Sequence, residues 1–158
     1  MITAEKVSIP GEFAADSRVW IYQSDRSFTG PEAAAIRALL ASFIAGWDSH
    51  GHRVKGYAGL LYNQFVVLVA DETATGVSGC STDSSVRLIR QLEDRTSARM
   101  FDRLNLAFLV DGEVLLVPMA QLSAALRAGT VTGETPYFNN TVQTKEEFES
   151  NWLIPLKQ

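Results

Sequence analysis

The sequence predicts an α+β fold that forms one domain over residues 1–158. The chain is 46% hydrophobic and 20% charged, which is ordinary globular composition. A chain of this length can bury a sizeable hydrophobic core without stabilisation by disulfide bonds or bound metal ions. After an irregular lead-in over residues 1–16, the element order is strand, helix, strand, strand, helix, strand. This order matches the ferredoxin-like split βαβ sandwich, in which both long helices pack on one face of an antiparallel sheet.

The first two elements have clear local signals. Arg18–Gln23 alternates apolar and other residues, which favours a strand. Thr29 and Glu32 form a capping box, which predicts a helix start there. The helix is expected over residues 30–47 because apolar residues recur at helical spacing. These residues are Ile36, Leu39, Leu40, Phe43, Ile44 and Trp47.

The middle of the chain predicts two strands and a second helix. Val54–Leu61 and Gln64–Ala70 are separated by a tight turn, and the second strand is apolar on both faces, as expected for a central strand. The next helix is expected to begin within Cys80–Ser85 and to end near Thr96. Its apolar residues recur every three positions. They are Val86, Ile89 and Leu92.

The last third predicts an additional hairpin strand and two short helices. Leu104–Val110 and Glu113–Val117 flank an Asp-Gly pair, which is a strong hairpin signal. The fifth strand is expected to extend the sheet beside the fourth. A short helix is expected over Met119–Ala128, a polar, turn-rich segment over Thr130–Val142, and a last helix after a second capping box at Thr144–Glu147.

Composition excludes several classes of function. The net charge is −4, and the ten arginines and four lysines are scattered, so neither nucleic acid nor a membrane surface is an expected partner. The longest apolar stretch, Phe65–Ala70, is too short to cross a bilayer. The single cysteine, Cys80, favours a reducing compartment. We therefore expect a soluble cytoplasmic protein.

Motifs for common cofactors are missing. None of the four lysines follows a glycine, so there is no Walker A loop, and no Gly-x-Gly pair exists for a dinucleotide. There is also no Cys-x-x-Cys, no His-Glu-x-x-His and no serine nucleophile elbow. We expect no cofactor.

The start of the second long helix is the strongest candidate site. Helix N-termini attract anions, and Gly79, Ser81, Thr82 and Ser84 are candidate anion contacts. Cys80 is the candidate catalytic residue, because a thiol at such a position has a lowered pKa. Helix capping and a buried cysteine explain the same residues, and this structural interpretation is the preferred one.

His50 and His52 are weak candidates for a metal site. Two histidines two residues apart on an extended segment face the same way. A site needs further ligands, for which Asp48, Asp71 and Glu72 are the nearest candidates along the chain. A polar turn between helix and strand is the preferred interpretation, so no metal is expected.

Four segments together resemble a known family. They are Val19–Gln23, Ser78–Ser85, Phe101–Leu104 and Phe138–Asn140. The chain resembles small uncharacterised bacterial proteins that are often labelled "ABC transporter ATPase". Such an ATPase needs a Walker A loop, a Walker B carboxylate and a signature of Leu-Ser-Gly-Gly-Gln type. Val77–Ser81 lacks the second glycine and the glutamine of that signature, so we do not expect ATPase activity.

Two main functional hypotheses remain open, beside the weaker option of a metal-dependent activity at His50 and His52. The first is a non-catalytic binding or self-assembly module, in which an exposed sheet edge or face pairs with an unknown protein or with a second copy as a homodimer. The alternative is a small-anion-binding or thiol-dependent enzyme that uses the helix start at Cys80–Ser85.

Overall fold

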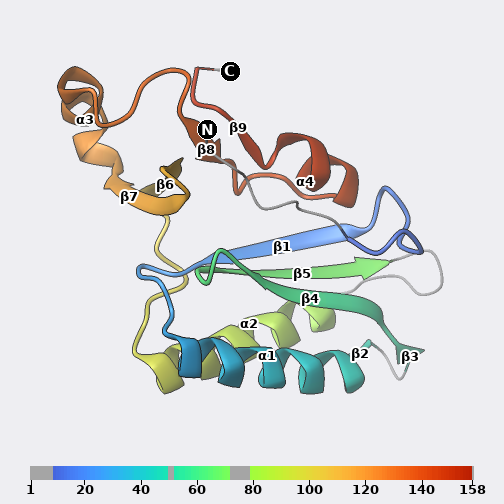
Figure 1. The fold of residues 1–158 in the computed structure, drawn as a ribbon. Coiled ribbons are helices and arrows are strands. Elements are labelled where there is room, and N and C mark those ends of the chain that lie inside the picture. Colours follow the sequence, from blue (N-terminus) through green and yellow to red (C-terminus); the bar gives the residue numbers. More distant parts are fainter. Residues whose placement is uncertain (1–8, 50–51, 72–78, 158) are drawn as a thin grey trace.

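The computed structural model describes residues 9–49, 52–71 and 79–157. These residues form two antiparallel sheets, a two-stranded ribbon and four α-helices (Figure 1). The strands are β1 (Arg18–Gln23), β2 (Asp48–Ser49), β3 (His52–Arg53), β4 (Lys55–Leu61), β5 (Phe65–Asp71), β6 (Asn105–Val110), β7 (Glu113–Pro118), β8 (Pro136–Phe138) and β9 (Leu153–Pro155). The helices are α1 (Gly30–Ala45), α2 (Gly79–Thr96), α3 (Leu122–Ala128) and α4 (Lys145–Asn151), with a 3₁₀ turn η1 (Met119–Gln121) before α3.

The first sheet has the order β1-β5-β4. All seven residues of β5 are buried, which confirms that this strand is central. The alternation along β1 divides its side chains between the two faces. Trp20 and Tyr22 pack against the helices, whereas Val19 and Ile21 pack on the opposite side. The sheet is therefore the middle layer of the molecule (Figure 1).

The helices α1 and α2 cover one face of this sheet (Figure 1). The predicted capping box starts α1, since Thr29 Oγ1 accepts the Glu32 N–H and the Glu32 carboxylate accepts the Thr29 N–H. Ile36 and Leu40 of α1, together with Leu92 of α2, are buried against the sheet. This packing forms the first hydrophobic core.

The second sheet has the order β7-β6-β8-β9 and lies on the opposite side of the first sheet, together with α4 (Figure 1). A second core fills the space between them. Phe65 of β5 meets Phe138 of β8 and Trp152, which follows α4, with ring centroids 4.6 and 5.2 Å apart. A smaller third core lies on the other face of this sheet, around Phe108, Val117 and Val131.

The ferredoxin-like arrangement predicted from the element order is not confirmed. In that arrangement β6 would belong to the same sheet as β1, but β6 pairs with β7 and β8 in the second sheet. Both faces of β6 are apolar, and each contributes to a different core. The outer edge of β1 instead bonds a later segment, because the Val19 N–H donates to the Gln143 carbonyl. The predicted β6–β7 hairpin is nevertheless present.

The C-terminal third contains strands that the sequence did not indicate. β8 lies within the segment predicted to be only turns, and β9 follows α4 directly. Each has three residues, which is too short for a visible alternation pattern. Among the helices of the described residues, none is long and apolar enough to cross a membrane.

Candidate functional site

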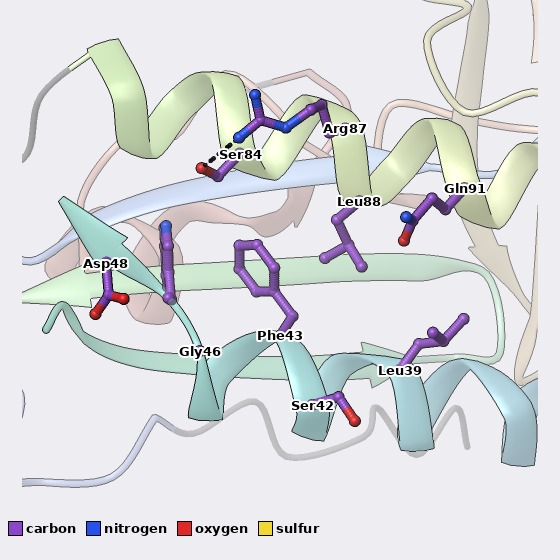
Figure 2. A pocket seen from close by; sticks show the side chains of 10 residues that line it. Leu39, Ser42, Phe43, Gly46, Asp48, Ser84, Arg87, Leu88 and Gln91 are labelled. Atoms are coloured by element: carbon purple, nitrogen blue, oxygen red, sulfur yellow. Dashed lines mark hydrogen bonds between the residues drawn. The ribbon is translucent and has the colours of Figure 1, made fainter.

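A groove of about 510 Å³ opens between α1 and α2 (Figure 2). Its volume lies within the usual range for small-molecule sites. The lining combines an apolar floor with a few polar side chains, which is typical of such sites. The lining residues are Leu39, Ser42, Phe43, Gly46, Trp47, Asp48, Ser84, Arg87, Leu88 and Gln91.

The apolar part of the groove comes from both helices. Phe43 of α1 and Leu88 of α2 point toward one another across it (Figure 2). Leu88 is buried, while Leu39 and Phe43 remain half-buried, so aromatic and aliphatic surface stays accessible. This accessible surface favours an apolar occupant.

Trp47 is held at the floor by tight packing. α1 ends at Ala45 with Gly46 as its C-cap, and the carbonyl of Trp47 then accepts the Val54 N–H at 2.9 Å. Its ring lies against Gly56 of β4, at a distance that leaves no room for a Cβ atom there. The ring centroid is 4.9 Å from that of Phe43 and 5.7 Å from that of Trp20. This aromatic cluster makes the floor rigid.

The floor also contains an unusual buried donor. Trp47 is 1% exposed, and its indole N–H finds no acceptor among the described residues. The same is true of the indole N–H of Trp20. A buried donor without a partner costs about 1–3 kcal/mol. Such groups are rare in native structures, in which nearly all buried polar atoms have a partner.

The polar groups stand at the rim. Arg87 of α2 is exposed, and its Nη2 donates to Ser84 Oγ at 3.2 Å, one turn earlier on the helix (Figure 2). Asp48, also exposed, stands at the opposite side of the groove next to the end of α1 (Figure 2). A guanidinium binds carboxylate, sulfonate and phosphate groups through paired hydrogen bonds. The groove therefore offers one anion-binding group beside an apolar surface.

A hydrogen bond fixes α2 to the sheet near this site. Tyr22 Oη of β1 lies 2.9 Å from Oγ of Ser85, which is fully buried. Burial raises the pKa of Tyr22 above its ordinary value, so the phenol remains neutral at physiological pH. Ser85 thus has a structural role, while the neighbouring Ser84 faces the groove.

The structure tests the predicted site residues only in part. α2 begins at Gly79, one residue before the range Cys80–Ser85 in which its start was expected. Of the anion-binding candidates, Ser84 lies in the groove. The side chains of Cys80, Ser81 and Thr82 lie outside the described residues, as does everything about Gly79 except its helical backbone. Arg87 was missed because one arginine among ten has no distinguishing signal in the sequence.

The predicted metal candidates gain no support. His50 lies outside the described residues, and His52 is placed in β3 only by its backbone. Within the described part of the chain, no three histidine, cysteine, aspartate or glutamate side chains gather into a possible metal site. Asp71 instead lies 3.7 Å from the Lys55 ammonium.

No protein-family model, curated protein or solved structure matches this chain.

Proposed function

We propose that this protein is a non-catalytic binding module that holds a small organic anion with an apolar body in the groove between α1 and α2. The observation that carries the proposal is the combination of an accessible apolar floor with a single guanidinium at its rim. The apolar body of the ligand packs between Phe43 and Leu88, and its acidic group pairs with Arg87. The volume of about 510 Å³ suits a molecule of modest size.

One further feature restricts the charge of the ligand. Asp48 at the opposite rim repels a second negative charge, so a monoanion is preferred over a dianion. A monocarboxylate or monosulfonate with an aromatic or branched body meets this condition and suits the apolar lining.

The probe for the test is anilinonaphthalene sulfonate, whose fluorescence rises in an apolar site. We expect Arg87→Gln to weaken binding of the probe about tenfold or more, because a hydrogen bond to a charged group contributes about 1.5–3 kcal/mol. Ser42→Phe fills the groove from an exposed position and should also reduce binding. Arg37→Gln makes the same charge change on α1 without lining the groove, so it serves as the matched control.

A second readout places the probe at the floor. In a spectrum of amide and indole N–H groups, the Trp47 indole signal is identified by its loss in Trp47→Phe. Probe binding should shift this signal in the wild type and leave the amide signals of the β6–β7 hairpin, which belongs to the second sheet, unchanged. If Arg87→Gln and Arg37→Gln bind the probe equally well and the Trp47 signal stays in place, the groove is not the binding site and the proposal fails.

A further inference from the structure

The groove between α1 and α2 carries two opposite charges, one on each wall. Arg87 belongs to α2, and Asp48 comes just after the C-cap of α1 (Figure 2). β2, which begins at Asp48, packs against α2. The two charged side chains are therefore brought to the same groove from segments on either side of it.

The direction of the two helices sets the order of the groups along the groove. Arg26 donates both to Glu32, in the first turn of α1, and to the carbonyl of Thr96, the last residue of α2. The start of α1 thus lies beside the end of α2, while the segment after α1 packs against α2. The helices run antiparallel, so the end of α1 faces the first half of α2.

The polar and apolar groups of the groove are consequently separated along its length. The charged end holds Asp48, Ser84 and Arg87, the middle holds Phe43 and Leu88, and the far end holds Leu39 and Gln91 (Figure 2). An occupant that fits this order has its charged groups together at one end and its apolar body beyond them.

The Asp48 carboxylate has no partner within the described part of the chain. No ion pair or hydrogen bond joins its side chain to another described residue. By contrast, the carboxylates of Asp25 and Asp102 each accept a backbone N–H. Water solvates Asp48 while the groove is open, because the side chain is exposed.

An occupant of the groove changes the solvation of Asp48. A body that packs between Phe43 and Leu88 displaces water from the charged end, and a carboxylate that loses water without gaining a partner is destabilised. A purely anionic ligand also meets its repulsion. A ligand with a positive group beside its acid removes both costs, since that group supplies the missing partner for Asp48.

We propose that the ligand of this groove is a zwitterion, namely a free α-amino acid with an aromatic or branched apolar side chain. This inference rests on the proposed function and adds an ammonium to the acidic ligand. The carboxylate pairs with the Arg87 guanidinium through two hydrogen bonds. The ammonium, which has three donors, binds Asp48. Both charges of an α-amino acid sit on one carbon atom, which matches their place at one end of the groove.

Three matched compounds test the proposal by isothermal titration calorimetry. L-phenylalanine has both charges, 3-phenylpropionate lacks the ammonium, and L-phenylalaninamide lacks the carboxylate and resembles the first residue of a peptide. We expect the wild type to bind phenylalanine about fivefold or more tightly than either of the other two, because a solvent-accessible ion pair contributes up to about this factor.

The variants separate the two charges. Asp48→Asn should weaken binding of phenylalanine about fivefold and leave binding of 3-phenylpropionate unchanged or stronger, because it removes an attraction for one compound and a repulsion for the other. Asp94→Asn makes the same charge change at an exposed position of α2 outside the groove, and it should bind both compounds as the wild type does. Asp48 is exposed, so Asp48→Asn should keep the Tm of the wild type.

The outcomes distinguish this inference from the proposed function. The zwitterion is overturned if the wild type binds 3-phenylpropionate or phenylalaninamide as tightly as phenylalanine, or if Asp48→Asn and Asp94→Asn bind phenylalanine alike. In either case the proposed function still stands when Arg87→Gln weakens binding of 3-phenylpropionate. If Arg87→Gln leaves binding of 3-phenylpropionate unchanged, the proposed function fails, and the assignment of the amino-acid carboxylate to Arg87 fails with it.

Discussion

Gly56 is the position at which one methyl group has the largest predicted effect on this fold. A Cβ atom added there would lie 2.6 and 2.8 Å from Cε3 and Cζ3 of Trp47, and 3.3 Å from Cδ1 of Ile44. Carbon atoms in contact prefer about 3.5–4.0 Å, so the indole would have to move by about 1 Å. The ring cannot move freely, because it is buried between Trp20 and Phe43.

The expected cost of Gly56→Ala follows from these distances. Overpacking of a well-packed core costs about 1–3 kcal/mol. Replacing glycine by alanine returns about 0.4–1 kcal/mol by restricting the unfolded chain. The net loss in unfolding free energy is therefore about 1–2 kcal/mol. For a protein of this size, that loss lowers the Tm by about 2–8 °C.

The assay is urea denaturation followed by tryptophan fluorescence and by circular dichroism. Gly59→Ala is the matched control on the same strand. Its Cβ would meet only the end of the Tyr57 side chain, at 3.1 Å from Oη and 3.6 Å from two ring carbons. This half-buried side chain is met only at its flexible far end, which can shift by a few tenths of an ångström, so we expect a change within about 0.5 kcal/mol. Trp47→Phe should relieve the Gly56→Ala strain in the double variant, because phenylalanine lacks the second ring. Equal stability of the two alanine variants would refute the packing argument.

Three further predictions concern single side chains. Hydrogen bonds from the Arg26 guanidinium hold the pKa of Glu32 at about 2. The pKa of Glu32 is lower in the folded state than in the unfolded state, so the ionised carboxylate stabilises the fold above about pH 4.5, and this stabilisation is lost as the pH falls toward 2. In a plot of unfolding free energy against pH, Glu32→Gln should therefore reduce the decline at acid pH. Burial raises the pKa of Tyr22 in the folded state, so stability should decline as the pH rises above 10, and Tyr22→Phe should reduce that decline in alkaline denaturation. Leu104 is 70% exposed and Leu109 is 1% exposed, so Leu104→Ala should change the unfolding free energy by less than about 0.5 kcal/mol, while Leu109→Ala should lower it by about 2–5 kcal/mol. A large loss at Leu104 in urea titrations would show that its exposed surface is covered in solution.

Local signals in the sequence were sufficient for most individual elements. The capping box at Thr29 and Glu32 starts α1 as predicted, because both of its hydrogen bonds involve residues three apart. The Asp-Gly pair produces the β6–β7 hairpin, with positive φ at both Asp111 and Gly112. The apolar run of β5 correctly indicated a central strand. In each case the determining interactions lie within a few residues of one another.

Strand partners and the candidate site were decided only by the tertiary structure. β6 has two apolar faces, a pattern that suits either sheet, and its place was settled by distant contacts with Tyr137 of β8. Arg87, Phe43 and Asp48 meet only because α1 and α2 pack on the same face of the first sheet. A sequence records which surfaces are apolar, polar or small, but which of these surfaces become neighbours depends on contacts between segments far apart in the chain.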